Sequence, residues 1–206
     1  MTTVRLYTSP ASRGEIARWM LEESGIPYDI SVLPAGVSRT DAAFLKLNPM
    51  AKVPVVVHGE TVVSEAAAIC LYLADAFPAA GLAPAVAERG DYYRWLTFAA
   101  GPLEAALTDH MLGFEVPDQL IKSVGYGCYA DVLDTLEGVL TTREYIAADR
   151  FTAADVYLGS KIGFYMKFGV MEKRPAFIDY CQRLHQRPAY IRAQQQEAEL
   201  LEQLSD

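Results

Sequence analysis

Cysteine and histidine are scarce in this sequence of 206 residues, which has three of each. The cysteines (Cys70, Cys128 and Cys181) lie far apart, form no Cys-x-x-Cys pair and are odd in number. This usage argues against a disulfide framework and favours buried thiols in a reducing compartment, the cytoplasm. Because no spacing among the cysteines and histidines is typical of a metal site, we also expect no bound metal.

Positive charge is limited as well, since 18 lysine and arginine residues face 26 aspartate and glutamate residues, for a net charge of −8. This charge would repel nucleic acid and anionic membrane surfaces, so neither is expected as a partner. No segment approaches the roughly 20 apolar residues of a membrane span, and the first residues lack the apolar core of a signal peptide. The chain is nevertheless 51% hydrophobic, which is enough to build the core of one large domain or two small ones.

The first part of the chain alternates between strand and helix patterns. Residues 4–7 predict a short strand, residues 12–24 an amphipathic helix that Gly25 ends, and residues 29–33 a second strand. A short helix is expected over 41–47. Because a strand, helix and strand in this order favour a right-handed crossover, the two strands should be parallel.

The segment from Asn48 to Pro78 is the one around which the chain is organised. Pro54 stands at the beginning of a β-branched run, residues 53–57, and a turn leads to a second short strand over 61–63. Because proline cannot donate to a sheet ladder, the first strand begins at an edge or where the backbone is left unpaired. If the peptide bond before Pro54 is cis, Val53 presents its N–H and C=O groups outward.

A helix is predicted to begin after this hairpin, at Ser64-Glu65. Its apolar residues, Ile69, Leu73 and Phe77, recur at helical spacing. The N–H groups of its first turn attract a carboxylate, and Glu65 can pair with an amine. A carboxylate and an amine side by side describe the end of an amino acid. The alternative interpretation is a ββα corner in which the proline only ends a loop.

The motif Asn-Pro-x-x-Lys-Val-Pro, followed by a hairpin and Ser-Glu-Ala-Ala-Ala-Ile, resembles the glutathione-binding half of cytosolic glutathione S-transferases. In that family the residue before a cis-proline pairs with the cysteinyl backbone of glutathione, and an acidic or amide residue with a serine holds the γ-glutamyl end. The resemblance assigns glutathione contacts to five positions: Lys52 (near the glycyl carboxylate), Val53, Pro54, Glu65 and Ala66. Ala66 replaces the usual serine and Ala51 a frequent glycine, and each change is expected to weaken affinity.

The resemblance also implies a fold and its domains. The fold class is an α/β thioredoxin-like N-terminal domain plus an all-α C-terminal helical domain, the glutathione transferase fold. The order of predicted elements up to residue 78 agrees with a thioredoxin-like domain over residues 1–78. Residues 79–84, rich in alanine, glycine and proline, predict a linker, and residues 85–206 the helical domain that contributes an electrophile pocket.

Beyond the linker the patterns predict helices. One covers 86–111 with a kink or local unwinding at Gly101-Pro102, and a second covers 117–141, regular only in its later part. Prolines at possible helix starts predict final helices over 175–185 and 188–204. The last of these is charged, and we expect it to be exposed.

Thr152 and Asp155 match a capping box before an apolar run, and Phe151 is placed to act as a hydrophobic staple. Such a cap stabilises a helix start by roughly 1 kcal/mol. The motif also resembles the one that begins the central core helix of the family's C-terminal domain. We therefore assign Asp155 a structural role and no part in catalysis.

Chemistry is expected where the first strand meets the first helix. A thiol has a pKa of about 8.5 and is mostly protonated at neutral pH, although the thiolate is the nucleophile. A hydroxyl donor, a helix N-terminus and a nearby cation would together lower that pKa. The sequence offers four hydroxyl residues here, followed by an arginine: Tyr7, Thr8, Ser9 and Ser12, then Arg13.

The resemblance divides over which hydroxyl activates the glutathione thiol. Ser9, four residues before Arg13 and followed by proline, is similar to the serine of theta-type enzymes and ranks first. Tyr7, six residues before Arg13, is similar to the tyrosine of alpha-type enzymes and ranks second. Ser12 falls where beta-type enzymes carry cysteine and ranks third. Each residue also has a plain structural interpretation, as a core strand residue for Tyr7 and as turn and cap residues for the two serines.

As a function, the resemblance implies a cytoplasmic, homodimeric detoxification enzyme. It would activate glutathione for attack on a small hydrophobic electrophile, and peroxidase activity is included in this expectation. Six residues could wall the electrophile pocket, or simply be core: Tyr92, Trp95, Phe98, Met111, Phe114 and Phe164. Met50 lies where some relatives place an aromatic dimer key.

Two other kinds of function remain open from the sequence. The chain could be a glutathione-fold protein that acts as a binding or interaction module without turnover. It could also be a specialised glutathione-dependent dehalogenase, isomerase or reductase. Conjugation of an aryl halide or reduction of a peroxide would distinguish a transferase from the first of these.

Overall fold

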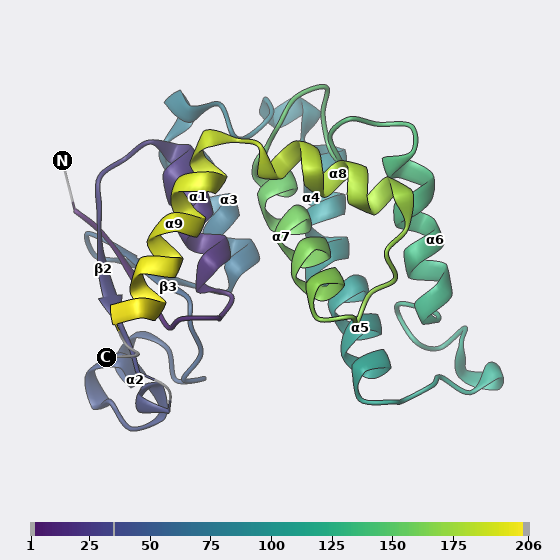
Figure 1. The fold of residues 1–206 in the computed structure, drawn as a ribbon, viewed down its shortest axis with the longest axis horizontal. Coiled ribbons are helices and arrows are strands. Elements are labelled where there is room, and N and C mark those ends of the chain that lie inside the picture. Colours follow the sequence, from purple (N-terminus) through teal and green to yellow (C-terminus); the bar gives the residue numbers. More distant parts are fainter. Residues whose placement is uncertain (1–2, 35, 204–206) are drawn as a thin grey trace. The chain divides into compact units, whose positions relative to one another are not determined.

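A computed structural model describes residues 3–34 and 36–203 (Figure 1). Residues 1 and 2 of the predicted N-terminal domain and residues 204–206 of the predicted helical domain lie outside the described residues. Position 204 is also the last residue of the final predicted helix. Two compact units are present: one formed by residues up to Ala83 together with those from Gln186 on, and one formed by Pro84–His185. Each unit is described by itself.

The first unit contains a mixed sheet of four strands. They are β1 (Val4–Thr8), β2 (Tyr28–Val32), β3 (Val55–His58) and β4 (Thr61–Ser64), in the order β2-β1-β3-β4. β1 and β2 are parallel, as the sequence predicted, and β1 with β3 and β3 with β4 are antiparallel. β3 begins two residues and ends one residue later than predicted, whereas β4 begins where predicted and ends one residue later.

Helices cover both faces of this sheet. Residues Val4, Leu6 and Thr8 of β1 are buried on one face, where helices α1 (Gly14–Ser24) and α3 (Ala66–Ala76) pack against each other. On the other face Tyr7 contacts Phe44 of α2 (Ala42–Leu47). This arrangement of helices around a mixed sheet is the thioredoxin-like fold that the sequence predicted.

The last helix, α9 (Pro188–Gln203), belongs to this first unit, whereas the sequence analysis placed it in the helical domain. It packs along α1, and Figure 1 shows the two helices side by side. The expectation that this helix is exposed holds for only part of it, because Ile191, Arg192 and Glu199 are exposed whereas Ala189, Ala193 and Glu197 are buried. Its small apolar residues allow α9 to approach α1 closely. The many charged residues of this helix had suggested exposure along its whole length instead.

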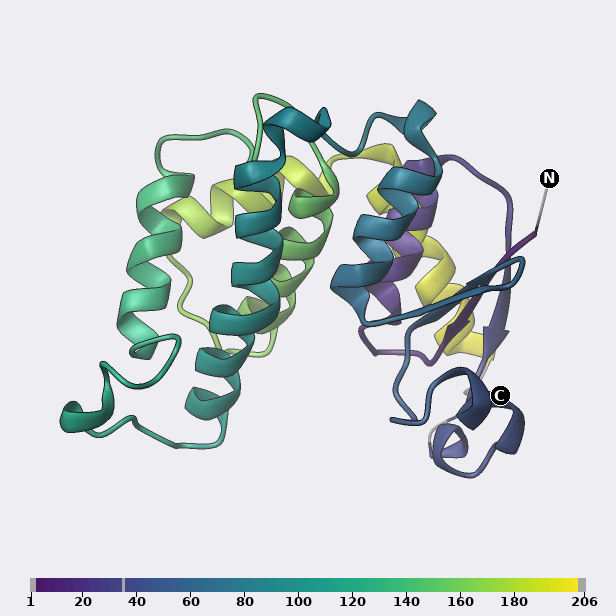
Figure 2. The ribbon, with the colours of Figure 1, turned by 180° about the vertical axis from the view of Figure 1, so that it is seen from behind.

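The second unit is helical throughout its regular elements. Its α-helices are α4 (Arg89–Phe98), α5 (Glu104–Met111), α6 (Tyr129–Leu140), α7 (Ala153–Lys167) and α8 (Pro175–His185). A π-helical turn over Ala99–Leu103, which contains Pro102, separates α4 from α5 and confirms the predicted unwinding (Figure 2, teal). The helix predicted over 117–141 was wrong in its first part, since residues before Tyr129 form a short 3-10 helix and turns.

Helix α7 is the buried centre of this unit. Its start carries the predicted capping box: the Thr152 side chain accepts the Asp155 backbone N–H, and the Asp155 side chain accepts the Thr152 backbone N–H.

Among the described residues, no helix is long and apolar enough to cross a membrane. In the same part of the chain, no group of three or more His, Cys, Asp or Glu side chains could hold a metal ion.

Candidate functional site

The sheet register brings the predicted site residues to one end of the first unit. Tyr7 of β1 pairs with Ser31 on one side and with Val55 on the other, and Val55 in turn pairs with Ser64. β1 ends one residue after this row, β3 begins at the row, and β4 ends at it. The loop after β1, the Val53-Pro54 peptide and the start of α3 therefore lie at the same end of the sheet.

The peptide bond between Val53 and Pro54 is cis, as expected. Pro54 is buried, Val53 is half-buried and Lys52 is exposed. Within the described part of the chain, the amide and carbonyl of Val53 form no hydrogen bond. Both groups are therefore available to an extended peptide backbone.

Asn48 shapes the loop that leads to this peptide, and the sequence analysis gave it no role. Its side chain is 4% exposed. The side-chain amide donates to the Lys52 carbonyl at 2.8 Å, and its oxygen accepts the Met50 amide at 3.1 Å. The Asn-Pro pair in the sequence was the available signal, because asparagine commonly forms such side-chain turns before a proline.

Glu65 precedes α3 in a backbone conformation that residues other than glycine rarely adopt, with φ 67° and ψ 115°. Its side chain is exposed and caps no N–H group of the helix. Left-handed conformations cost roughly 1–2 kcal/mol for a residue with a Cβ, and such residues cluster at functional sites. The next residue, Ala66, is buried and begins the helix.

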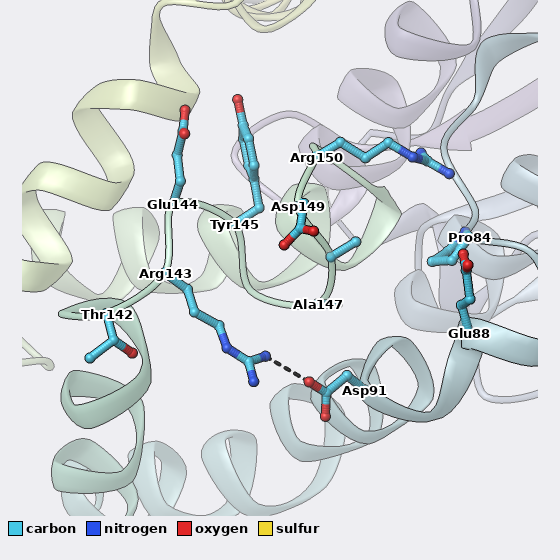
Figure 3. Close-up of a pocket in the computed structure, with 11 residues that line it drawn as sticks. Pro84, Glu88, Asp91, Thr142, Arg143, Glu144, Tyr145, Ala147, Asp149 and Arg150 are labelled. Atoms are coloured by element: carbon cyan, nitrogen blue, oxygen red, sulfur yellow. Dashed lines mark hydrogen bonds and ion pairs between the residues drawn. The ribbon is translucent and has the colours of Figure 1, made fainter.

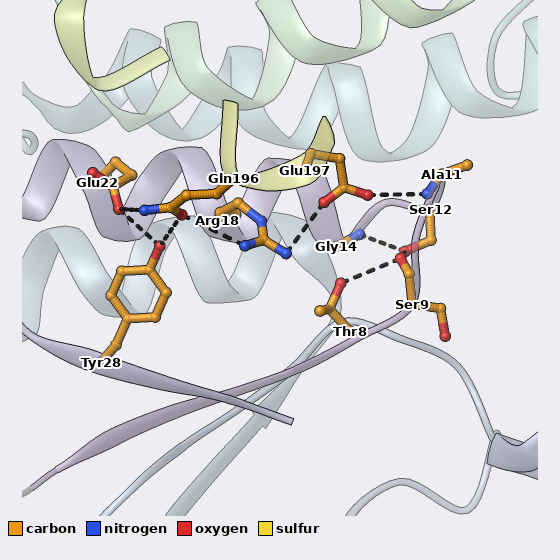
Figure 4. Close-up of polar contacts among 10 residues, drawn as sticks. All are labelled: Thr8, Ser9, Ala11, Ser12, Gly14, Arg18, Glu22, Tyr28, Gln196 and Glu197. Carbon is orange, nitrogen blue, oxygen red and sulfur yellow. Dashed lines mark hydrogen bonds and ion pairs between the residues drawn. The ribbon is translucent and has the colours of Figure 1, made fainter. Parts of the chain in front are cut away.

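The loop between β1 and α1 holds its hydroxyl groups in a local network (Figure 4). The Ser9 hydroxyl donates to the carbonyl of Leu33, just after β2, at 2.6 Å. The Ser12 hydroxyl donates to the Ser9 carbonyl at 2.6 Å and accepts the Gly14 amide at 3.0 Å. Ser12 thus lies one residue before the N-cap of α1, which is Arg13.

The two remaining candidates, Tyr7 near the end of β1 and Arg13 at the N-cap of α1, differ in their surroundings. Tyr7 is half-buried with its ring 5.9 Å from that of Phe44, and its hydroxyl has no partner among the described residues. Arg13 is exposed.

Thr8 is buried against Gly14, where an added Cβ would lie 1.8 Å from the Thr8 Oγ1. Only glycine therefore allows α1 to begin so close to the end of β1.

A buried ion pair that the sequence analysis missed meets the same loop (Figure 4). Glu197 of α9 accepts the Ala11 amide at 3.0 Å, and its other oxygen lies 3.2 Å from an Arg18 nitrogen of α1. No local signal could have found this contact, because Ala11 and Glu197 are 186 residues apart in the sequence.

The protein's own cysteines are poor nucleophiles where burial is complete or nearly so. All three carry free thiols. Burial raises the pKa of the Cys181 thiol to about 12, and it raises the pKa of Cys70 further still. A reactive thiolate at the β1–α1 loop would have to come from a bound thiol.

A cleft of about 750 Å³ lies within the second unit, between the start of α4 and residues 142–150 (Figure 3). Charged groups of both signs line it, and Arg143 pairs with Asp91 across it at 2.6 Å. It contains none of the predicted site residues. Such a polar lining does not suit a small hydrophobic electrophile.

The six residues expected to wall an electrophile pocket do not form one group. Tyr92 and Trp95 are 1% and 2% exposed and belong to the core of the second unit, so the simpler interpretation was correct for them. Phe98 is half-buried, whereas Met111, Phe114 and Phe164 are exposed. Phe98 and Pro102 line a shallow groove of about 480 Å³ along α4.

Comparison with known proteins agrees with this geometry. A family model described as the glutathione S-transferase N-terminal domain matches residues 9–76. Glutathione S-transferase 3 of Zea mays is 31% identical over 167 residues, which is 75% of each chain. A glutathione transferase structure from Methylococcus capsulatus is 26% identical with a TM-score of 0.79, covering 95% of this chain and 99% of that one. A sphingomonad glutathione S-transferase complexed with glutathione is 27% identical with a TM-score of 0.76, covering 94% and 98%. The chain belongs to the glutathione S-transferase family.

Proposed function

We propose that this protein is a glutathione transferase. It binds glutathione at the end of the sheet where the Val53-Pro54 peptide lies and activates the thiol for attack on a small hydrophobic electrophile. The observation that carries the proposal is the row Tyr7, Val55 and Ser64, which places an unpaired peptide, a helix start and a loop of hydroxyl groups together. The sphingomonad relative that was solved with glutathione supports the choice of ligand.

Each glutathione contact has a proposed partner. The amide and carbonyl of Val53 pair with the cysteinyl backbone, in the manner of an added strand. Glu65 pairs with the amine of the γ-glutamyl end, and the Ala66 amide donates to its carboxylate at the start of α3. Lys52 faces the glycyl carboxylate. Pro54 fixes the direction in which Val53 presents its backbone.

Thiol activation is the step that needs a specific hydroxyl. Lowering the thiol pKa by about two units requires about 2.7 kcal/mol of preferential stabilisation of the thiolate. A hydroxyl donor and the positive end of α1 together supply an amount of this order. Arg13, at the N-cap of α1, adds positive charge near the same place.

The hydrogen bonds favour Ser12 over Ser9, which the sequence analysis ranked first. Ser12 accepts the Gly14 amide of the first helical turn, and this polarises its hydroxyl and makes it a stronger donor. Its own donated bond stays within the loop, so the hydroxyl can turn toward a sulfur without disturbing the sheet. Ser9 donates to a carbonyl beside β2, and turning it would leave that carbonyl without its donor. Tyr7 is kept as the third candidate because its ring packs on α2.

The remaining parts of the proposal concern assembly and setting. We propose a homodimer, with the 70% exposed Met50 at its interface, although the sequence offers no aromatic key there. The free thiols suit the cytoplasm, where detoxification by conjugation and by peroxide reduction takes place. Light scattering of the purified protein tests the dimer directly.

One experiment tests the activity itself. Calorimetry with glutathione measures binding, and the ultraviolet absorbance of the thiolate, followed against pH, gives the pKa of the bound thiol. Chlorodinitrobenzene then reports conjugation. Binding with a lowered thiol pKa and turnover supports the transferase. Binding with an unchanged pKa and no turnover of this aryl halide or of a peroxide would support the non-catalytic binding module instead. A lowered thiol pKa without turnover points to a dehalogenase, isomerase or reductase.

A further inference from the structure

We propose that Glu197, in the last helix, is a positioning residue for thiol activation. It holds the loop between β1 and α1 in the conformation that presents the Ser12 hydroxyl. This inference rests on the proposed function, because it gives a role in that reaction to a residue at the far end of the sequence.

The contact falls at the middle of the loop. Ala11 lies between Ser9 and Ser12 and has a φ of 51°, in the left-handed region that favours glycine. Its amide donates to the Glu197 carboxylate at 3.0 Å, and Glu197 is only 5% exposed. An alanine in this conformation is strained by roughly 1–2 kcal/mol, so the loop needs an interaction that keeps it there.

Arg18 holds the Glu197 carboxylate in place. Its guanidinium is 2% exposed, lies 3.2 Å from the second Glu197 oxygen and reaches Gln196 at 3.5 Å (Figure 4). The ion pair thus aims the first oxygen of Glu197 at Ala11.

Stability alone does not account for this pair. Burying two charges costs several kcal/mol of hydration, and well-packed apolar side chains of similar volume often serve a core equally well or better. Helix α9 is already attached to α1 by other ion pairs, Arg187 with Glu23 and Arg192 with Glu22. What Glu197 supplies, and an apolar side chain cannot, is an acceptor for the Ala11 amide.

The consequence for the reaction follows from the loop's own hydrogen bond. The Ser12 hydroxyl bonds to the Ser9 carbonyl across Ala11, so a change at Ala11 moves both ends of this contact. Without an acceptor inside the protein, the Ala11 amide would turn toward water and the loop would sample several conformations. Proximity and orientation of the hydroxyl would then be lost in part. The proposed glutathione contacts at Val53 and Glu65 would remain, so kcat should suffer more than KM for glutathione.

The test compares two double variants that carry no buried charge. Arg18→Leu/Glu197→Leu removes the ion pair and the acceptor, whereas Arg18→Leu/Glu197→Gln removes the ion pair and keeps an acceptor oxygen for Ala11. Arg192→Leu is the matched control, because it breaks an exposed α9–α1 ion pair that does not touch the loop. Thermal unfolding confirms that each variant is folded before glutathione and chlorodinitrobenzene are used as probes.

We expect the variant with leucine at both positions to raise the pKa of bound glutathione by about one unit and to lower kcat about tenfold. KM for glutathione should change by less than about threefold, which separates positioning from ground-state binding. The variant with glutamine should recover most of kcat and of the lowered thiol pKa, and Arg192→Leu should match the wild type. A wild-type kcat and thiol pKa in the double leucine variant would overturn the inference while leaving the transferase intact.

A second measurement needs no variant. The Ala11 amide proton of the wild-type protein should exchange slowly with deuterium, because a buried carboxylate accepts it. Exchange as fast as that of an unbonded loop amide would overturn the inference, even if the double variants do not fold. If the wild-type protein neither lowers the thiol pKa nor conjugates the aryl halide, the proposed function fails first, and that outcome is distinct from both results.

Discussion

The carboxylate of Asp155 accepts the hydroxyl of Tyr180 at 2.8 Å, and both side chains are completely buried. The same carboxylate accepts the amide of Ile146 at 2.8 Å and the amide of Thr152 at 2.9 Å. It therefore connects the loop before α7, the first turn of α7 and helix α8. Asp155, which the sequence predicted as a helix cap, therefore links three segments of the second unit through its hydrogen bonds.

Replacing Asp155 should destabilise the protein without changing its chemistry. Asp155→Ala leaves two buried amides and the Tyr180 hydroxyl unsatisfied, so we expect a loss of about 3 kcal/mol in the free energy of unfolding. Tyr180→Phe removes one of these bonds and should cost only about 1 kcal/mol. Urea unfolding measures both. Equal stability of the alanine variant and the wild type would contradict a fastening role, and reduced kcat per folded molecule would contradict a purely structural one.

Alanine or phenylalanine replacements separate the candidate thiol activators. We expect Ser12→Ala to lower kcat for chlorodinitrobenzene conjugation about a hundredfold and to raise the pKa of bound glutathione, because a donor to the thiolate is lost. Ser9→Ala and Tyr7→Phe should retain most of kcat. Calorimetry should find glutathione affinity nearly unchanged in all three. A loss of activity confined to Ser9→Ala would restore the order in which the sequence placed these residues.

Elements whose signals are local could be predicted from the sequence. Gly25 ends α1 with a φ of 66°, and the π-helical turn around Pro102 falls at the predicted interruption. The capping box at Thr152 and the Val53-Pro54 turn likewise depend on neighbouring residues. In each case the residue that causes the feature lies within a few positions of it, so a pattern of types and spacings is sufficient.

Features that depend on distant residues could not be predicted. The acidic face of α9 looked solvated, because nothing near Glu197 in the sequence reveals Arg18 or the Ala11 amide that meet it. The order of the candidate serines also required the structure, since only the hydrogen bonds to Leu33 and Gly14 distinguish them. The beginning of α6, by contrast, has a local signal. The helix predicted over 117–141 was expected to be regular only in its later part, and Gly127, two residues before Tyr129, adopts a left-handed conformation that ends any regular helix before it.

Glu65 offers a case in which stability and binding should change in opposite directions. Glu65→Gly relieves a positive φ, so the free energy of unfolding should rise by up to about 1 kcal/mol. The same change removes the carboxylate proposed to pair with the γ-glutamyl amine, and glutathione affinity should fall by about tenfold to a hundredfold. Ala51→Gly is the matched control, because Ala51 has a φ of 55° and no carboxylate. Calorimetry should find its affinity equal to or higher than that of the wild type, because glycine is the residue that the family frequently has there. Full affinity in Glu65→Gly would remove Glu65 from the glutathione site.

His185 should make the stability of the protein depend on pH. Its imidazole lies at the end of α8 against Gly163, where an added Cβ would be 3.2 Å from the ring. Burial lowers the pKa of His185 below its ordinary value of 6.5. The unfolded chain therefore binds a proton at this residue more readily than the folded chain does, and stability is lost as the pH falls below about 6.5.

The expected slope is at most about 1.4 kcal/mol per pH unit, and it ends where the folded imidazole also becomes protonated. His185→Gln should flatten this part of the stability curve, because the variant has no group there to titrate. Urea unfolding at a series of pH values between about 5 and 8, a range that brackets the histidine titration, measures both proteins. A curve for His185→Gln that runs parallel to the wild-type curve would assign the pH dependence to other groups, because the variant removes the protonation of this one half-buried imidazole.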